Sequence, residues 1–475
     1  MATLKSKFKN KKNEKRSLKM KITKEIKTDV LTPVSIYLRL QGKNKVMLES
    51  IPRENEKSRF SIIAVNPVHH IKFQNQILTI DGEVKETTDP LKTIESLVNQ
   101  PQEKQDDLPF SSGAIGYAGF DTYGIYEHID FSKQLEDPIG TPDIYFMLYE
   151  SYVIFDHKKE TLLLVEDDVY SHRTQEELLS ALTEKYEALN VLSPMENHFA
   201  QNKKLTFSSQ MTKEDFEANV KAAKTLIRQG DMFQIVLSQR LSAHFFGDAF
   251  NYYRGLRIEN PSSYMYFLEF DGFYIIGCSP ERLVAVQNGI VSTNPIAGTR
   301  KRGETDEEDQ KLIEELKNDE KECAEHRMLV DLGRNDIGKI SEYGTVEVTH
   351  FMEIEKYRYV MHITSEVKGT LKTEYTAMDA LISTLPAGTL SGAPKNRAYH
   401  RIYEFETQKR GIYGGAIGYL TKNGNCDFAI AIRTMVLKDQ TAYVQAGAGI
   451  VYDSDPASEY QETLNKAKAL LEIGE

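Results

Sequence analysis

The chain has 475 residues, more than one simple hydrophobic core usually holds, so two or more domains are expected. Hydrophobic residues make up 40% and charged residues 27%, which excludes a largely disordered or low-complexity chain. No apolar run approaches the ~18 residues that a membrane-spanning helix needs. The three cysteines form no CxxC pair, which argues against a zinc cage or a disulfide framework, so a cytoplasmic location is expected.

The net charge of −11 is unevenly distributed. Residues 1–27 carry eleven Lys or Arg and two Glu, a net +9, so the remainder carries −20. An acidic body repels nucleic acid and anionic membranes, and neither is an expected partner. We interpret 1–27 as a basic disordered tail, within which Met20 is a second candidate start. Nucleic-acid binding by this tail is the non-enzymatic alternative.

Residues 28–192 form the first predicted region. Strand-like runs at 34–40, 59–65 and 71–84, punctuated by turns, favour antiparallel hairpins over βαβ units. Further strands are predicted within 145–156 and 161–168, and helical periodicity follows at 176–192. The polar segment 193–204 contains a proline and is the predicted linker.

Residues 205–475 form the second region. Helices are predicted at 213–230, at 306–332 and after Asp455, which can cap a helix that has proline in its first position. Strands are predicted between 265 and 293. The pentapeptide GAIGY occurs at 113–117 and again at 415–419, which indicates that both halves give similar strands to one sheet system. The predicted fold class is α+β, with antiparallel sheets and helices outside.

Two carboxylate pairs have helical spacing. Glu322 and Glu325 lie three residues apart, as do Glu459 and Glu462, so each pair shares a helix face. Lys466 follows Glu462 by four residues on the same face. Two such helices could hold a hard dication such as Mg²⁺, which takes few protein carboxylates and keeps several waters. The alternative is two solvated faces with salt bridges.

Three loops rich in small residues lie at 294–303, 385–395 and 445–451. Glycine allows a ligand to approach backbone N–H groups, and the Ser-Gly-Ala-Pro run is typical of an anion-binding helix start. No P-loop or dinucleotide fingerprint is present, so a small carboxylated ligand is favoured over a nucleotide. Arg433 is then a candidate carboxylate clamp, with an edge-strand salt bridge as the alternative.

Two further residues could carry chemistry. His362 alternates like a strand residue, a pattern also typical of a hydrogen-bonded packing histidine. Glu281 follows an apolar run at a strand–turn junction, an unusual place for a carboxylate without a role. No Ser-His-Asp, HExxH or Cys-His signature appears, so covalent hydrolase chemistry is not indicated.

Taken together, these segments resemble the chorismate-utilising enzymes, and among them component I of the anthranilate synthases. The resemblance covers Thr32 to the C-terminus and is carried by TPVSIYLRL, GCSPERLV, PIAGTR, AEHRMLVDLGRNDIGKI, VMHITS, PAGTLSGAPK, YGGAIGYL, AGAGIV and SEYQETLNKA. It implies two large antiparallel sheets in a β-sandwich-like core with peripheral helices.

The resemblance also implies a ligand set. Glu325 and Glu462 match the Mg²⁺ ligands, with Glu322 and Glu459 as neighbours that act through water. The residues that match contacts to chorismate are Gly298, Thr299, Tyr413, Arg433, Gly447, Ala448, Gly449 and Lys466. Glu281 matches the general acid that protonates the leaving C4 hydroxyl, and His362 and Thr389 match residues of the second, pyruvate-eliminating step.

Two positions distinguish close relatives. Aminodeoxychorismate synthases carry a nucleophilic lysine where this chain has Ala297, and isochorismate and salicylate synthases carry a water-activating lysine at Gln234. The resemblance therefore favours ammonia attack at C2 and formation of anthranilate through aminodeoxyisochorismate. The para-forming synthase and isochorismate synthase remain the alternatives within the family.

The resemblance finally implies partners and regulation. A separate glutamine amidotransferase subunit is expected to supply ammonia, in a heterodimer or heterotetramer. Relatives inhibited by tryptophan bind it between two segments that here include Ser50 and Ser263, Tyr264 and Met265. Relatives carry proline at Ser263, so we expect weaker feedback inhibition, because the serine frees a backbone φ that proline fixes.

Overall fold

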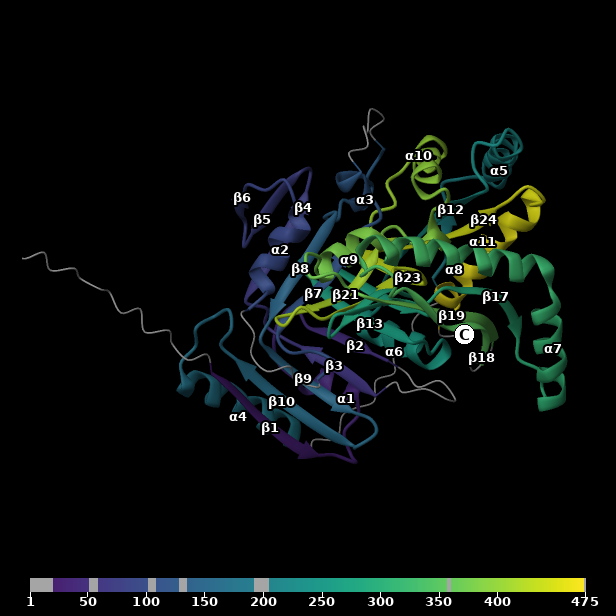
Figure 1. Cartoon of the computed structure of the whole chain (residues 1–475). Coiled ribbons are helices and arrows are strands. Elements are labelled where there is room, and N and C mark those ends of the chain that lie inside the picture. Colours follow the sequence, from purple (N-terminus) through teal and green to yellow (C-terminus); the bar gives the residue numbers. More distant parts are fainter. Residues whose placement is uncertain are drawn as a thin grey trace, which may run out of the picture.

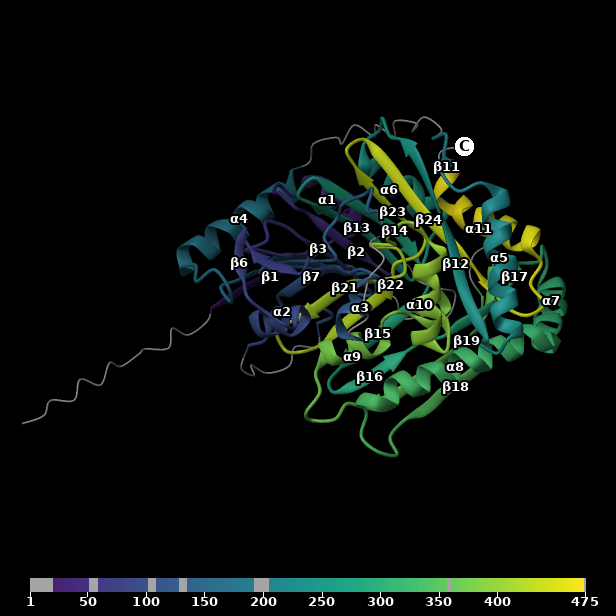
Figure 2. The ribbon, with the colours of Figure 1, turned by 90° about the horizontal axis from the view of Figure 1, so that it is seen from above.

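The computed structural model describes residues 20–50, 59–100, 108–127, 135–191, 205–356 and 360–473. Two antiparallel sheets of twelve strands each form its core, with helices on the outside (Figure 1, Figure 2). This architecture confirms the predicted α+β fold. The predicted linker at 193–204 and the first 19 residues of the predicted tail lie outside the described residues. None of the described helices is long and apolar enough to cross a bilayer.

The first sheet joins both halves of the chain. Its strand order is β1 (Lys21–Lys27), β10 (Thr161–Asp167), β9 (Ser151–Asp156), β3 (Phe60–Ala64), β2 (Val46–Glu49), β13 (Tyr264–Phe270), β14 (Phe273–Ser279), β23 (Thr434–Lys438), β24 (Thr441–Ile450), β12 (Gln234–His244) and β11 (Ser208–Ser209), with β20 (Gly392–Ala393) paired to β12. The two predicted regions, 28–192 and 205–475, therefore share this sheet.

The second sheet is divided between the halves in the same way. Its order is β17 (Ile296–Lys301), β19 (Val360–Thr370), β16 (Ile290–Thr293), β15 (Arg282–Gln287), β22 (Cys426–Ile430), β21 (Ala416–Thr421), β7 (Gly113–Ala118), β8 (Ile144–Tyr149), β4 (His69–Gln74), β5 (Ile77–Ile80) and β6 (Glu83–Lys85), with β18 (Glu347–Lys356) paired to β19.

The repeated GAIGY segments meet at the centre of this second sheet. They lie in β7 and β21, which pair with Gly116 opposite Gly418. A Cβ atom at Gly116 would lie 2.1 Å from the Tyr145 carbonyl oxygen, and one at Gly418 would lie 2.0 Å from that of Asp427. Only glycine allows so close an approach of neighbouring backbone. The predicted contribution of similar strands by both halves is confirmed.

Three apolar layers hold the sheets and helices together, as strand side chains alternate between faces. Between the sheets lies an aromatic-rich cluster that includes Tyr117, Tyr145 and Phe270. The outer face of the first sheet is covered by α1 (Pro33–Arg39), α4 (Gln175–Asn190), α6 (Ala249–Glu259) and α11 (Pro456–Leu471). That of the second is covered by α2 (Pro90–Val98), α8 (Glu320–Ile340) and α9 (Ala377–Thr384).

The remaining helices are α3 (Thr122–Tyr126), α5 (Lys213–Arg228), α7 (Asp306–Asn318) and α10 (Lys395–Phe405), with a 3₁₀ turn at Gly388–Leu390. Residues from α5 and α10 share a fourth apolar cluster with β12 and β24. Figure 1 shows α5, α10 and α11 on one side of the molecule, next to β12 and β24. On this side, β24 and α11 carry the candidate site residues Gly447, Ala448, Gly449, Glu459, Glu462 and Lys466.

Three local predictions were wrong. The run 34–40, predicted as a strand, lies largely in α1, because Thr32 caps that helix and Pro33 occupies its first turn. The single helix predicted at 306–332 is two helices, since Asp319 ends α7 and its side chain caps α8. Residues 21–27, placed in the disordered tail, form β1, which pairs along its full length with β10.

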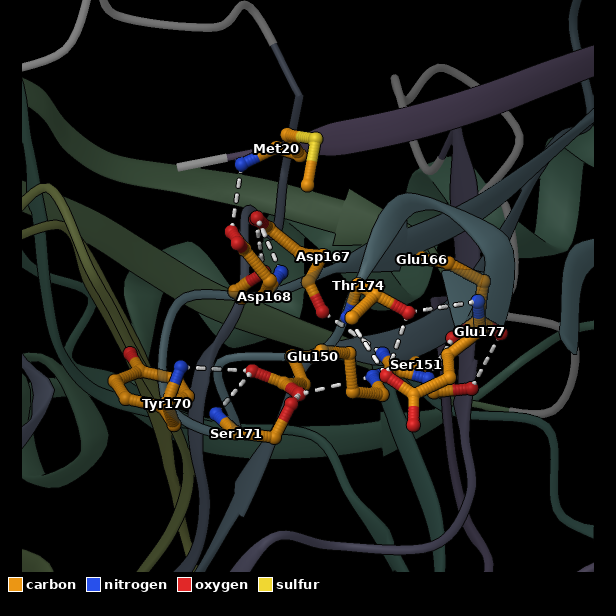
Figure 3. A network of polar contacts seen from close by, with 12 residues as sticks. Met20, Glu150, Ser151, Glu166, Asp167, Asp168, Tyr170, Ser171, Thr174 and Glu177 are labelled. Atoms are coloured by element: carbon orange, nitrogen blue, oxygen red, sulfur yellow. Dashed lines mark hydrogen bonds and ion pairs between the residues drawn. The ribbon is translucent and has the colours of Figure 1, made fainter. Parts of the chain in front are cut away.

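A buried ionic network fixes α4 to the first sheet (Figure 3). The Lys185 ammonium lies 2.7 Å from a Glu166 carboxylate oxygen, and Arg173 lies 2.8 Å from the other. Glu150 accepts hydrogen bonds from the backbone N–H groups of Tyr170 and Ser171. Lys185 and Glu166 are almost fully buried, so each charge depends on its partner.

Candidate functional site

Glu281 is the most unusual carboxyl group of the site. It lies in the turn between β14 and β15 and is 7% exposed. Thr389, in the 3₁₀ turn, donates its hydroxyl hydrogen to Glu281 Oε1 across 3.3 Å. Burial raises the pKa of Glu281 to about 8, although Thr389, Lys466 and Arg433 act in the opposite direction. A carboxyl group with this pKa holds its proton at neutral pH and can act as a general acid.

His362 lies on β19, directly opposite Thr299 of β17. Its Nδ1 is 3.0 Å from the Gly298 carbonyl oxygen and 3.0 Å from the Thr299 hydroxyl oxygen. Because a carbonyl oxygen can only accept, Nδ1 carries the hydrogen, and in the neutral ring Nε2 carries the lone pair. The structure therefore brings together His362 and the predicted loop residues Gly298 and Thr299.

Gly298, in the loop 294–303, packs against α8, the helix that carries Glu322 and Glu325. Its φ is +65°, which favours glycine, and a Cβ atom would lie 3.2 Å from Glu322 Oε2. Arg300, two residues later, is held by Glu315 and Asp319 at 2.9 Å each. The loop and the start of α8 are thus packed against each other.

Gln234, at the start of β12, contacts the second member of that pair. Its amide Nε2 donates to Glu325 Oε1 across 3.3 Å. An ionised carboxylate can only accept hydrogen bonds, so the Gln234 amide nitrogen must face Glu325. The amide oxygen of Gln234 then points away from Glu325. Gln234 is 3% exposed, and its Oε1 has no hydrogen-bond partner. The sequence marked this position only by what it lacks, a lysine.

The middle of the site is a strip of β24. A Cβ atom at Gly449 would lie 2.6 Å from Gln234 Nε2, and one at Gly447 would lie 2.9 Å from the Tyr413 hydroxyl. Positions two apart share one face of a strand, so both glycines open the same face. Ala448 points to the opposite face, where it joins an apolar cluster, so only its backbone can contact a ligand.

Lys466 and Glu462 reach this strip from α11. The Lys466 ammonium donates to the Gly447 carbonyl oxygen across 3.1 Å and lies 2.7 Å from Glu462 Oε1. Asp455 caps α11 and Pro456 starts it, as predicted. Arg433, in the left-handed conformation between β22 and β23, is close enough to Glu281 to lower the pKa of that carboxyl group.

The four glutamates supply the donor atoms that a hard dication prefers. Burial raises the pKa of Glu322 and of Glu459, and the neighbouring Glu325 and Glu462 add to the respective effects. A cation would relieve this repulsion, so the donor set fits Mg²⁺. Among the described residues, no group of three or more ligand-type side chains is close enough to hold a metal ion as placed.

A large cavity lies beside the site. Its volume is about 980 Å³, and its walls include all four residues that match the tryptophan pocket, Ser50, Ser263, Tyr264 and Met265. The Tyr264 hydroxyl accepts from Arg282 Nε at 2.7 Å and donates to Asp427 Oδ1 at 2.9 Å. Arg282 and Asp427 were not among the site residues predicted from the sequence, although Arg282 directly follows Glu281 in the SPERL motif.

The structure thus brings together the residues predicted from the three small-residue loops, both carboxylate helices and Glu281. A family model for chorismate binding enzymes matches residues 43–472. Anthranilate synthase component 1 of Lactococcus lactis subsp. lactis is 67% identical over 458 residues, 96% of this chain and 100% of that protein. The protein of the same name from Acetivibrio thermocellus is 46% identical, over 95% of this chain and 94% of its own.

Solved structures agree with this assignment. Anthranilate synthase component I from Streptococcus pneumoniae TIGR4 superimposes with a TM-score of 0.83 at 53% identity, covering 94% of this chain and 98% of that one. The menaquinone-specific isochorismate synthase of Escherichia coli, at 19% identity and a TM-score of 0.70 over 95% of each chain, shows the fold alone. The chain therefore belongs to the chorismate-binding enzymes and, within them, to the anthranilate synthase component 1 family.

Proposed function

We propose that the chain converts chorismate and ammonia to anthranilate and pyruvate, the first step of tryptophan biosynthesis. The observation that carries the proposal is Glu281, a buried acid with a pKa raised to about 8 and a hydrogen bond from Thr389. Loss of the C4 hydroxyl needs a proton donor, because hydroxide is a poor leaving group. The high identity to anthranilate synthase component 1 proteins supports the same reaction.

Substrate binding follows from the charges of the site. Chorismate is a dicarboxylate, and the site holds two cations, Lys466 and Arg433, whose charges act on Glu281 and lower its pKa. The glycine strip at 447–449 lets a carboxylate approach the backbone, with the Tyr413 hydroxyl beside it. Gly298 and Thr299 close the site on the side of His362.

The carboxylate helices support a Mg²⁺ site, with Glu325 and Glu462 as ligands and Glu322 and Glu459 acting through water. When bound, Mg²⁺ would neutralise the ring carboxylate of chorismate and so favour attack at C2. Gln234 would hold Glu325 in place through its amide, as second-shell groups hold metal ligands elsewhere.

The first step is addition of ammonia at C2. The ammonia lone pair forms the new C2–N bond, the ring double bonds shift, and the C4–O bond breaks as Glu281 protonates the departing oxygen, which leaves as water. The second step eliminates pyruvate from aminodeoxyisochorismate. His362 is suited to accept the C2 proton through Nε2 while the C2–H electron pair forms the new ring double bond and the C3–O bond breaks. The enolpyruvate that leaves takes up a proton at its methylene carbon and becomes pyruvate.

Two residues support attack by ammonia rather than by water or lysine. Ala297 offers no nucleophile, and Gln234 cannot deprotonate water. The buried Oε1 of Gln234 can instead accept a hydrogen bond from ammonia. Formation of para-aminobenzoate precursors or of isochorismate is the competing outcome, and replacing Ala297 or Gln234 with lysine tests it.

We further infer an ammonia-supplying partner, because the name component 1 implies a second component. A glutamine amidotransferase subunit in a heterodimer or heterotetramer would fill that role. The free and buried cysteines Cys278, Cys323 and Cys426 support work in the reducing cytoplasm. We also infer that tryptophan occupies the 980 Å³ cavity and inhibits the enzyme, since a cavity of this size suits a small molecule.

The test incubates the purified chain with chorismate, Mg²⁺ and ammonium at about pH 8.5, where free ammonia is available, and follows anthranilate fluorescence. Fluorescence that disappears with EDTA and returns with Mg²⁺ is the expected result. Consumption of chorismate without fluorescence would instead identify the para-forming or isochorismate reaction by chromatography. Untouched chorismate, also in the presence of the amidotransferase subunit, would overturn the proposal.

A further inference from the structure

A small cavity of about 40 Å³ adjoins Glu281, apart from the large one. Its polar lining includes Glu281, Thr389, Thr384 and Asp336, and its apolar walls include leucines of α8. The volume exceeds what one water molecule needs, and the polar groups suffice to hold it. The cavity therefore connects the proposed acid to a second, distant carboxylate.

One carboxylate oxygen of Asp336 accepts a hydrogen bond, and the other accepts none. Its Oδ2 lies 2.7 Å from the Lys395 ammonium, which also donates to the Thr384 carbonyl oxygen at 3.1 Å. Its Oδ1 is buried and accepts no hydrogen bond, although the ammonium of Lys339 lies 3.6 Å away. Lys339 is 55% exposed, so this ammonium connects the carboxylate to bulk solvent.

Glu281 must be protonated again in each turnover, and this arrangement offers a route for the proton. In the proposed reaction it gives up its proton in every turnover and must regain one before the next. Its side chain is buried, and bound chorismate would occupy the side that faces Lys466 and Arg433. A route from solvent that bypasses the substrate requires a chain of polar groups on another side of Glu281. Asp336, the cavity and Thr389 are such a chain.

We propose that Asp336 and water in the small cavity relay protons from solvent to Glu281. After Glu281 has protonated the leaving oxygen, the Asp336 carboxylate, held at Oδ2 by Lys395, accepts a proton at Oδ1 from solvent beside Lys339. Asp336 passes this proton to the cavity water, the water gives a proton to the Glu281 carboxylate, and Asp336 is ionised again. No atom is consumed, and one proton moves inward for each proton lost to the substrate. The relay rests on the proposed function of Glu281.

The test compares three variants with the parent chain. The double variant Asp336→Asn/Lys395→Met removes the relay carboxylate without leaving the lysine unpaired in the interior. Gly333→Ala adds a Cβ that would lie 3.2 Å from Thr293 and 3.5 Å from Pro295, both in the cavity wall, and it replaces glycine inside α8. Asp167→Asn/Lys422→Met, which removes another buried pair at 2.9 Å, controls for lost stability.

For both relay variants we expect kcat with saturating ammonia to fall at least tenfold, with the KM for chorismate unchanged. The solvent deuterium isotope effect on kcat should rise, and imidazolium buffer should restore part of the rate by protonating Glu281 directly. The control pair should lower the melting temperature but keep the parent's kcat and isotope effect.

If Asp336→Asn/Lys395→Met does not fold, the Gly333→Ala variant still tests the proposal. Parent-like kcat and isotope effect in a folded relay variant would overturn the relay and leave the proposed function intact. A reduced kcat that buffer does not rescue would show a merely structural role for Asp336 and would overturn it as well. Absence of anthranilate from the parent chain would overturn both.

Discussion

The Thr389 hydroxyl and the Glu281 carboxyl group meet across 3.3 Å, with threonine as the donor. The two residues are 108 positions apart, and each lies in a turn, so neither belongs to a regular element that the other contacts. This hydrogen bond favours the ionised form of Glu281, whereas burial favours the protonated form more strongly. The balance leaves an acid that is protonated at neutral pH and can still release its proton.

The first prediction concerns this balance. Activity should fall as the pH rises through about 8, because Glu281 must be protonated to act as the acid. Thr389→Val removes the bond that lowers the pKa, so the alkaline limb should move to higher pH. Thr389→Ser keeps the hydroxyl and should leave the limb in place. The measurement is kcat against pH at saturating free ammonia, and an unmoved limb in the valine variant would contradict the assignment.

Removal of the acid itself should have a larger effect. We expect Glu281→Gln to lower kcat by about 10²–10⁴-fold, the usual contribution of a general acid. The alkaline limb near pH 8 should disappear, since no group with that pKa remains to be deprotonated. A glutamine variant that retains both its rate and the limb would show that another group donates the proton.

The carboxylate helices predict a graded loss of metal binding. Glu325→Gln and Glu462→Gln should abolish Mg²⁺-dependent turnover, and calorimetry should detect no Mg²⁺ binding. Glu322→Gln should weaken Mg²⁺ affinity by about 10–100-fold, as loss of a second-shell group usually does. Glu320→Gln, on the exposed first turn of α8, is the matched control and should bind normally. Normal turnover by either of the first two variants would refute the ligand assignment.

The large cavity predicts a residue that affects inhibition more than turnover. The Tyr264 hydroxyl joins Arg282 and Asp427 in the cavity wall, and a hydrogen bond to a charged group contributes about 1.5–3 kcal/mol. Tyr264→Phe should therefore weaken tryptophan inhibition by about tenfold or more, with kcat near that of the parent. Tyr343→Phe, at a fully exposed position, serves as control. Unchanged inhibition would place the tryptophan site elsewhere.

The buried network beside α4 predicts a stability effect without a catalytic one. Lys185→Met should lower the free energy of unfolding by about 3–5 kcal/mol, because Glu166 keeps a buried charge without its lysine partner. Glu166→Gln/Lys185→Met should recover most of that loss. Lys213→Met, which breaks an exposed pair with Glu217 at 3.7 Å, should cost less than about 1 kcal/mol. Denaturant unfolding measures all three.

The sequence by itself was sufficient for everything that depends on local pattern. Alternating apolar runs predicted antiparallel strands, and the Asp-Pro start of α11 was visible in the chain, because capping and periodicity act over a few residues. The two GAIGY segments predicted one shared sheet system, and the ordered motifs predicted the family and its candidate site residues. Local pattern gave a wrong prediction at α1, where the cap at Thr32 makes an apolar run helical. It was also wrong at Asp319, whose side chain caps α8 and divides a charged run into two helices.

Only the tertiary structure decided which of these residues meet. The pKa of Glu281 depends on burial and on Thr389, Lys466 and Arg433, which come from three other parts of the chain. The unpaired oxygens of Gln234 and Asp336, and the two cavities, exist because packing excludes water and leaves a polar atom without a partner. Desolvation and long-range pairing are properties of the folded chain, and no spacing along the sequence encodes them directly.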